Sequence, residues 1–219
     1  MRLALISDTH GMLPTSFPPD IDAIIHAGDI GPDREYDWYG VEFARWCARA
    51  NVPVYFTWGN HDFIGQRVEW QDQRDFLYDL APNARECKDE AVSIGGKKFW
   101  FSPWVTNLPT WAFNLTPEQA MAKHAQIPDD VDFIVSHAPP YGAGDSLRAS
   151  AIKYGLPNNE RVGDIALGIV ARKIKAPIIC GHIHEDRGIT LRDGLHVINV
   201  ASVNGLYRPQ PDRWTLLEI

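Results

Sequence analysis

Five short apolar stretches of this sequence each stop at a polar fragment rich in Asp, Asn and His. The stretches and the fragments that follow them are residues 3–6 before Asp8-Thr9-His10, 23–27 before Gly28-Asp29, 52–57 before Gly59-Asn60-His61-Asp62, 133–136 before His137, and 178–180 before Gly181-His182-Ile183-His184. Short apolar runs of this kind are typical of strands buried in a parallel sheet, whose carboxyl ends meet at one edge. The pattern therefore predicts an α/β fold with a functional site at that edge.

The polar fragments contain residue types that bind metal ions. Residues i and i+2 of an extended segment point to the same face, so Asp8 and His10 can hold one cation, and His182 and His184 can do the same. Carboxylate, imidazole and amide oxygen together favour Mn²⁺, Fe or Zn²⁺ over Ca²⁺. One such fragment alone is more often a turn or a half-buried strand, but five in one chain predict a metal centre.

Four helices are expected outside the strands. The first covers residues 36–50, where Phe43, Trp46, Cys47 and Ala50 share one apolar face. Two more cover residues 69–80 and 116–126, and the latter opens with a capping box at Thr116 and Pro at the first helical position. The apolar face of the fourth helix is expected to consist of Val162, Ile165, Ala166, Ile169 and Val170.

Turn residues and alternating apolar residues predict further strands. Residues 91–101 are expected to form a hairpin that turns at Gly95-Gly96, and residues 188–191, 195–200 and 214–218 are expected to be antiparallel strands. A parallel sheet early in the chain and an antiparallel one late in it predict two sheets packed face to face with helices outside. The Gly- and Pro-rich loop over residues 138–159 is expected near the site. No repeat or linker divides the chain, so residues 1–219 are expected to form a single domain.

Composition disfavours several classes of protein. The formal net charge of −7 and the pI near 5.6 argue against binding to a phosphate backbone, so no stable nucleic-acid complex is expected. Three widely spaced cysteines, Cys47, Cys87 and Cys180, fit a reducing compartment and do not suggest a disulfide framework. No apolar run reaches the length of a membrane span, and a cleaved leader would remove the fragment at Asp8, so a cytoplasmic location is expected.

The five polar fragments, in this order, resemble those of the calcineurin-like metallophosphoesterases. The chain is most similar to the metallophosphoesterase-domain-containing subgroup, which is class III cyclic-nucleotide-phosphodiesterase-like. The residues that carry this second likeness are Ser102-Pro103-Trp104, Trp111-Ala112-Phe113-Asn114, His137-Ala138-Pro139-Pro140, Gly142, Asp145 and Gly181-His182-Ile183-His184-Glu185. The resemblance implies an α/β fold that is a four-layer α-β-β-α sandwich of two mixed sheets, with a two-metal site between the carboxyl ends of the strands.

The resemblance also implies roles for individual residues. One divalent metal ion would be held by Asp8, His10 and His184, and the second by Asn60, His137 and His182. Asp29 would bridge the two ions, which makes it both a metal ligand and a catalytic residue. Two cations about 3.5–4 Å apart can acidify a water molecule and clamp phosphate oxygens. Mn²⁺ is the expected metal, with Fe or Zn²⁺ as alternatives. His61 resembles the residue that protonates the leaving oxygen, and imidazole suits this task because its pKa lies near neutrality.

The resemblance therefore implies a phosphodiesterase that cleaves P–O bonds by in-line attack of a bridging hydroxide. Small phosphodiesters such as 2′,3′- or 3′,5′-cyclic nucleotides are the expected substrates. A phosphomonoesterase or nucleotide pyrophosphatase of the same superfamily, and a non-catalytic binding scaffold, remain as alternatives, and the oligomeric state stays open.

Two sequence details narrow this prediction. After Gly28-Asp29 the chain lacks the Val-Asp-Arg-Gly continuation of Ser/Thr protein phosphatases, which disfavours that activity. His182 is intact, whereas some vertebrate members of the subgroup carry a substitution there, so both metal sites are expected to be complete. The loops of cysteine phosphatases, P-loop proteins and serine hydrolases do not occur in the sequence.

The remaining histidines have less specific interpretations. His26 lies within an apolar stretch and is expected to be a core residue. His124 is expected on the surface of a polar helix, and His196 is expected away from the site. Asp145 belongs to the family-like fragments, and we expect it to fix its own loop.

An aromatic loop and two cations are further candidates for contact with a substrate. Trp104, Trp111 and Phe113 either stack on a ring of the substrate or form a local core, and the sequence leaves both interpretations open. Arg148 and Lys153 are expected to be surface charges unless they meet a phosphate group.

Overall fold

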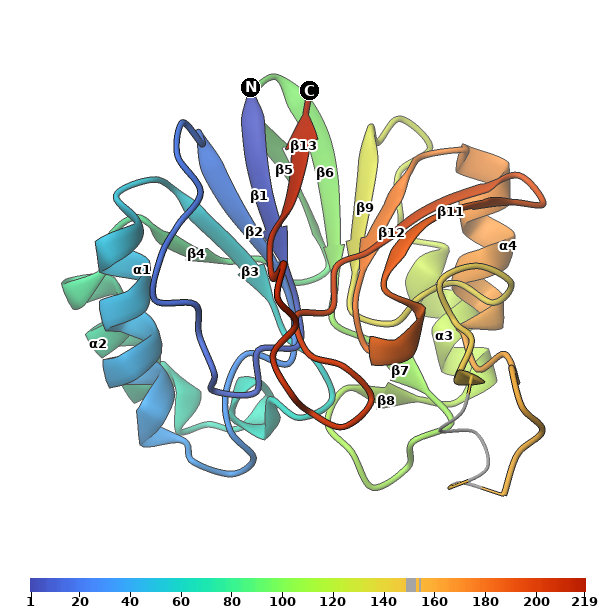
Figure 1. Ribbon diagram of the computed structural model, residues 1–219, viewed down its shortest axis with the longest axis horizontal. Helices are drawn as coiled ribbons and strands as arrows, with labels where there is room; N and C mark the ends of the chain where they lie inside the picture. The colour runs from blue at the N-terminus through green and yellow to red at the C-terminus, as the bar shows by residue number, and fades with distance from the viewer. Residues whose placement is uncertain (149–152, 154) are drawn as a thin grey trace.

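The computed structural model describes residues 1–148, 153 and 155–219, and its centre consists of two β-sheets packed face to face (Figure 1). The first sheet has the strand order β13-β1-β2-β3-β4 and the second the order β11-β12-β10-β9-β6-β5. The strands of the first sheet are β13 (Thr215–Glu218), β1 (Arg2–Ile6), β2 (Ala23–Ala27), β3 (Val54–Thr57) and β4 (Ala84–Glu86). Those of the second are β11 (Gly188–Arg192), β12 (Leu195–Asn199), β10 (Ile178–Cys180), β9 (Phe133–Ser136), β6 (Lys97–Ser102) and β5 (Glu90–Ile94). A short pair, β7 (Val105–Thr106) and β8 (Asn114–Leu115), lies outside both sheets.

Helices cover the outer faces of the two sheets and complete four layers. The helices α1 (Ala44–Ala50) and α2 (Trp70–Leu80) lie on the first sheet, and α3 (Pro117–His124) and α4 (Ile165–Ile174) lie on the second (Figure 1). Strand β1 is apolar on both faces, because Leu3 and Leu5 pack in the core between the sheets while Ala4 and Ile6 pack in the core under the helices. The structure confirms the α-β-β-α sandwich of two mixed sheets.

Local sequence explains where the helices begin. The first predicted helix starts later than expected, as a π-helical turn over Tyr39–Phe43 that continues into α1, and its predicted apolar face is buried. The helix α3 begins with the predicted capping box, in which the Thr116 hydroxyl accepts the amide N–H of Gln119. Short 3-10 helices, η2 (Phe63–Gln66) and η4 (His184–Asp186), adjoin two of the polar fragments.

The prediction that the late strands form a separate antiparallel sheet is wrong. Strands β11 and β12 do form an antiparallel hairpin, but β12 pairs in parallel with β10, as do β10 with β9 and β9 with β6. Strand β13 leaves this sheet and pairs antiparallel with β1, with Leu216 opposite Ala4. Alternating apolar residues identify a strand and its buried face but not its partner, so these pairings could not be predicted locally.

The apolar face predicted for the fourth helix is only partly right, because Ala166 is buried and Val170 packs against the core but the other three residues do not form this face. Asp164 caps α4 by accepting the amide N–H of Leu167 at 2.9 Å, so Val162 lies outside the helix. Ile165 and Ile169 are 63% and 53% exposed, because a different face packs on the sheet. The buried residues of this face are Ala166, Leu167, Gly168 and Ala171. Three of these four residues are Ala or Gly, which lets the helix approach its neighbours closely.

Other expectations concern the cysteines, the membrane and the loop after β9. The three cysteines are unpaired and buried. Among the residues that the structure describes, no helix is long and apolar enough to cross a membrane. The expected loop over residues 138–159 follows β9, although residues 149–152 and 154 lie outside the described part of the chain.

Candidate metal centre

The polar fragments that follow five strands lie together at one edge of the two sheets. The first sheet contributes Asp8 and His10 after β1, Asp29 after β2, and Asn60 and His61 after β3, and the second contributes His137 after β9 and His182 and His184 after β10. Backbone hydrogen bonds join their loops: the amide of Asp8 donates to the carbonyl of Gly28 at 2.9 Å, and that of Gly181 to the carbonyl of His137 at 3.0 Å. The predicted fragments therefore meet in space.

Their side chains form three groups whose ligand atoms lie within 4.8 Å of one another. The groups are Asp8, His10 and His184; Asp29, His137 and His182; and His10, Asp29 and His61. Asn60 adjoins the second group, because its Oδ1 lies 3.1 Å from Nε2 of His137. Buried carboxylate, imidazole and amide donors in this arrangement fit divalent transition-metal ions.

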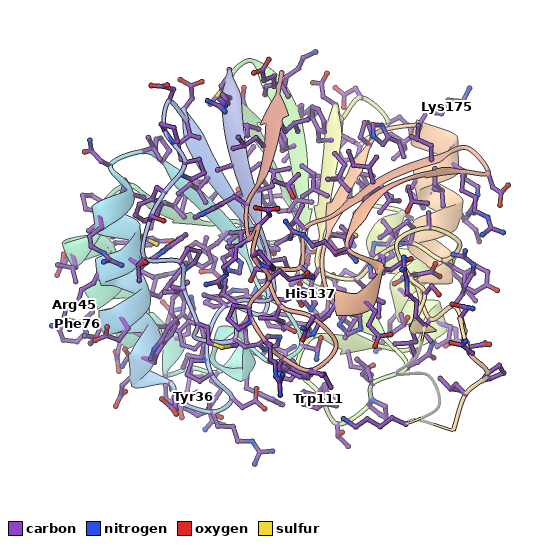
Figure 2. All side chains as sticks on the ribbon, in the orientation of Figure 1. Tyr36, Arg45, Phe76, Trp111, His137 and Lys175 are labelled. Carbon is purple, nitrogen blue, oxygen red and sulfur yellow. The ribbon has the colours of Figure 1, made fainter. Side chains whose placement is uncertain are left out.

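Asp29 lies in the middle of this cluster. Its Oδ2 lies 3.3 Å from Nε2 of His137 and 3.9 Å from Nε2 of both His10 and His61. Its Oδ1 accepts the amide N–H of His61 at 2.9 Å, which fixes the orientation of the carboxylate. Figure 2 shows His137 in the middle of the molecule, beneath the sheets. One carboxylate thus adjoins imidazoles from both of the predicted ligand sets.

Sharp left-handed turns direct the ligand side chains into the cluster. The backbone angle φ is 54° at Asp8, 44° at His10, 51° at Asp29 and 66° at His182. This region costs a residue other than glycine about 1–2 kcal/mol. Gly181 precedes the last of these turns, and a Cβ at its position would collide with Oδ2 of Asp8. Strained backbone at several neighbouring positions is typical of a functional site.

Burial and charge set the pKa values of the candidate ligand side chains. Burial opposes the ionisation of Asp8, but the hydrogen bond and charge of the adjacent His184 prevail and hold the pKa of Asp8 well below its ordinary range. Burial likewise opposes the charged form of His137, yet the carboxylate of Asp29 raises the pKa of His137 to about 9. Burial lowers the pKa of His10 to about 4. At neutral pH Asp8 is therefore a carboxylate and His10 a neutral imidazole, the states that bind cations, whereas His137 holds a proton that a bound cation would displace.

His61 is held by a carboxylate that no motif in the sequence marks. Its Nδ1 lies 2.5 Å from Oδ1 of Asp33, which leaves Nε2 facing Asp29. The side chain of Asp33 is 52% exposed, whereas that of His61 is 11% exposed. Asp33 lies in the segment that departs from the protein-phosphatase pattern, and no spacing rule identifies it as a partner of His61.

Asp62 has a structural role that its place beside His61 did not reveal. Its Oδ1 accepts the hydroxyl hydrogen of Tyr39 at 2.6 Å and the amide N–H of Ile30 at 2.9 Å, and its Oδ2 accepts the amide N–H of Gly59 at 2.8 Å. Burial, followed by the charge of Asp29, raises the pKa of Asp62 to about 6. Asp62 therefore fastens the loop after β2 to the loop after β3.

The remaining histidines lie outside these groups, among the described residues. His26 is buried in β2 with Nε2 2.9 Å from Oγ1 of Thr9, as expected for a core residue. The prediction that His124 lies on a helix surface is wrong, because it is 1% exposed and its Nε2 lies 3.0 Å from Oδ2 of Asp164. Since Asp164 also caps α4, this buried pair joins α3 to α4. His196 is exposed on β12.

The three aromatic residues of the loop lie in two different environments, one beside the cluster and two in a local core. The ring of Trp111 lies beside His61, with 4.3 Å between the two ring centroids. The indole N–H of Trp104 donates to Asp89 at 2.7 Å, and Phe113 is fully buried. The local-core interpretation therefore holds for Trp104 and Phe113.

A residue near the end of the chain also borders the cluster. Tyr207 lies in the loop between β12 and β13, and its ring centroid is 4.9 Å from those of both His10 and His184. A cavity of about 400 Å³ lies beside this loop and includes His184 and Arg148 in its lining. No motif in the sequence points to Tyr207.

In the loop after β9, Asp145 and Arg148 have the structural roles that were predicted for them. Asp145 is fully buried and accepts the amide N–H groups of Gly142 and Gly163 at 3.0 Å and 3.2 Å. It therefore fixes its own loop. Arg148 is a surface residue that pairs with Asp186 at 2.9 Å.

The fold and the cluster define a metallophosphoesterase, and comparison with known proteins agrees. Residues 1–186 match the calcineurin-like phosphoesterase family, and the chain belongs to this family. It is 27% identical over 235 residues to metallophosphoesterase domain-containing protein 1 of Homo sapiens, a match that covers 95% of this chain and 68% of that protein. It is 28% identical over 218 residues to UPF0046 protein K07C11.7 of Caenorhabditis elegans, covering 93% and 70%.

A solved structure shows the same fold. TT1561 of Thermus thermophilus is similar with a TM-score of 0.65 at 14% identity, and the match covers 91% of this chain and 88% of that one. The family and the named relatives confirm the subgroup resemblance and establish the chain as a metal-dependent phosphoesterase.

Proposed function

We propose that this protein is a phosphodiesterase with a two-metal centre. The observation that carries the proposal is the position of Asp29, whose Oδ2 lies 3.3 Å from His137 and 3.9 Å from His10. A single carboxylate between two sets of imidazoles is what two like-charged ions need in order to sit close together.

The ligand sets of the proposal follow the groups described above. Asp8, His10 and His184 hold one ion, Asn60, His137 and His182 hold the other, and Asp29 serves both. Two bound cations lower the pKa of water and neutralise charge on the phosphate oxygens. Mn²⁺ suits these donors, and Fe and Zn²⁺ are the alternatives that elemental analysis distinguishes.

His61 is the proton donor to the leaving oxygen in this proposal. The hydrogen bond between Nδ1 and Asp33 fixes the ring, so Nε2 is the nitrogen that faces the cluster. The carboxylate at Nδ1 thus orients the imidazole, so that the proton to be transferred is the one on Nε2. The proton passes from Nε2 to the leaving oxygen, and the neutral imidazole then regains a proton from water.

The preference for diesters over monoesters rests on the resemblance to the metallophosphoesterase-domain-containing subgroup. Two arginines, Arg148 and Arg187, line the cavity beside His184, where they can meet an anionic substrate. Small phosphodiesters, including 2′,3′- and 3′,5′-cyclic nucleotides, are the proposed substrates.

Hydrolysis of bis(p-nitrophenyl) phosphate beside p-nitrophenyl phosphate tests the proposal. With Mn²⁺ present we expect faster turnover of the diester, and a chelator should abolish it. Faster turnover of the monoester would favour the phosphomonoesterase alternative. Protein that contains metal yet hydrolyses neither ester, nor a cyclic nucleotide, would support the binding-scaffold alternative and contradict the proposal.

A further inference from the structure

Two aromatic side chains from distant parts of the chain border His61, and we call them the aromatic rim. They are Trp111, whose ring centroid lies 4.3 Å from that of His61, and Tyr207, at 6.2 Å from it. Tyr207 also lies 4.9 Å from His10. Both rings thus adjoin the side chain that we assign to the leaving oxygen. Figure 2 shows Trp111 at the lower edge of the molecule, where the side chains meet solvent.

The loop that carries Trp111 is attached directly to a metal-ligand loop. The amide N–H of Ala112 donates to the carbonyl of Asn60 at 3.1 Å, and Trp111 itself packs beside Phe63. Five of the seven other tryptophans donate their indole N–H to a partner within the fold, and among the described residues Trp38 and Trp100 do not. The five are Trp46, Trp58, Trp70, Trp104 and Trp214. Across the described residues the indole N–H of Trp111 makes no such bond, and its ring is only half-buried. Internal hydrogen bonding therefore does not explain the placement of this indole.

The loop that carries Tyr207 is attached to the other side of the cluster. Ser202 donates its amide N–H to the carbonyl of Ser7 at 2.8 Å and its hydroxyl to the carbonyl of Asp8 at 3.0 Å. Within the loop, Oδ1 of Asn204 accepts the amide N–H groups of residues 206 and 208 at 2.9 Å and 3.1 Å. These bonds hold Tyr207 at the cluster.

Tyr207 combines a left-handed backbone with a partly exposed side chain. Its φ is 56°, in the left-handed region, and 44% of its surface is exposed. A strained position is retained when the surrounding structure fixes it, and such positions gather at functional sites. An exposed tyrosine ring offers a flat face on which a planar group can stack.

We propose that the aromatic rim binds a planar aromatic ring of the phosphoester, so that Trp111 and Tyr207 determine the substrate class. This inference rests on the proposed function, because it places the substrate's phosphate at the metal-ligand groups. The ring belongs either to an aryl ester or to the base of a nucleotide. Stacking on an aromatic side chain strengthens binding of a base by about five- to 150-fold.

Binding of phenylphosphonate and methylphosphonate to the Mn²⁺-containing protein tests the rim without catalysis. The two compounds share the same charged group, and their carbon–phosphorus bonds are not cleaved by a phosphoesterase. Calorimetric titration should show at least about fivefold tighter binding of phenylphosphonate. Tyr207→Leu and Trp111→Leu should each reduce this ratio severalfold while leaving the affinity for methylphosphonate within about twofold. Tyr207→Phe keeps the ring and should keep the ratio.

A matched control is available on the same protein. Tyr141 is also 44% exposed but lies in the loop after β9, and Tyr141→Leu should leave both affinities unchanged. Equal affinities of the two phosphonates for the unmodified protein would overturn the proposal. So would an equal loss of both affinities in Tyr207→Leu and Trp111→Leu, which would show a purely structural role.

A second pair of compounds distinguishes the two sources of the ring. Thymidine 5′-phosphate is compared with 2-deoxyribose 5-phosphate under the same conditions. Tighter binding of thymidine 5′-phosphate that is lost in Tyr207→Leu would show that the rim binds the base of a nucleotide. Tighter binding of phenylphosphonate alone would show that it binds simple aryl esters. Tighter binding of phenylphosphonate than of methylphosphonate by a protein that does not hydrolyse a diester would contradict only the proposed function. Protein that hydrolyses diesters without the ratio would contradict only the rim.

Discussion

The ligand cluster and the aromatic rim meet at His61 but are built in opposite ways. The cluster consists of Asp8, His10, Asp29, Asn60, His137, His182 and His184, which are delivered by strand ends. Asp8 and His137 are fully buried, and Asp29 is 1% exposed. The rim residue Tyr207 is 44% exposed and lies in the loop between β12 and β13. This part of the chain is drawn in red in Figure 1.

Because of this difference, we expect the cluster to carry out the reaction and the rim to select the substrate. A buried strand end can hold a carboxylate to within a few tenths of an ångström because the sheet cannot deform locally. A loop side chain can change from one protein to another without disturbing the sheet. We therefore expect substitutions in the cluster to abolish reaction with every substrate, and substitutions at the rim to alter which substrates react.

Asp29→Asn is expected to have the largest effect. The amide oxygen that replaces the carboxylate carries no full charge, so it cannot offset the repulsion between two cations. Turnover of bis(p-nitrophenyl) phosphate should fall by about 10³-fold or more. Elemental analysis after gel filtration should find fewer than two metal ions per chain, and two ions per chain would contradict the bridging role.

His61→Ala is expected to lower turnover by about 10²–10⁴-fold when the leaving group is an alkoxide. An alkoxide needs a proton as it departs, whereas p-nitrophenolate leaves without one, so the ester of p-nitrophenol should be much less affected. A 3′,5′-cyclic nucleotide and bis(p-nitrophenyl) phosphate provide the two leaving groups. The metal content should stay unchanged, and its loss would place His61 among the ligands, with His10 and Asp29 beside it.

Much of the fold and the cluster could be predicted because their signals are local. A buried strand must be apolar along its whole length, so a polar residue at its end marks both the end of the strand and the edge of the sheet. For this reason the amino-acid sequence by itself places Asp8, Asp29, Asn60, His137 and His182 at the sheet edge. Helix caps were equally clear, as Thr116 shows.

The errors arose where a contact joins residues far apart in sequence. β12 was expected in an antiparallel sheet, yet its parallel partner β10 is identified only when the whole sheet is assembled. His124 was expected on the surface because its helix is polar, but it is buried and pairs with Asp164, forty residues later in the sequence. Asp33 and Tyr207 were missed for the same reason, since neither lies in a repeated or spaced pattern with His61.

After removal of the metal, the free energy of unfolding should depend on pH through the ion pair between His137 and Asp29. The pKa of His137 rises from an ordinary value of 6.5 to about 9 in the folded protein. The stabilisation by this pair is therefore complete below pH 6.5 and is lost as the pH rises to 9, a loss of roughly 3 kcal/mol. Urea unfolding of chelator-treated protein at about pH 6.5, 7.5 and 9 measures it.

Two controls separate this loss from a general effect of alkaline pH. With a cation bound, His137 must be neutral, so metal-containing protein should not show the fall. Asp29→Asn removes the partner charge, and its chelator-treated form should unfold at similar urea concentrations across the range. A parallel fall in all three proteins would show that His137 does not hold its proton in the way described.

Asp33→Asn is expected to have the smallest effect on turnover, about tenfold for an alkoxide leaving group. The asparagine oxygen can still accept a hydrogen bond from Nδ1 of His61, but a neutral acceptor forms a weaker hydrogen bond and orients the ring less firmly. The side chain is 52% exposed, so stability should change by less than about 0.5 kcal/mol and metal content should not change. In the His61→Ala background the same substitution should have no further effect, because residues that act as a unit are not additive. An additional tenfold loss there would mean that Asp33 acts on the substrate directly, and that the exposed edge of the site contributes to the chemistry as well as to the choice of substrate.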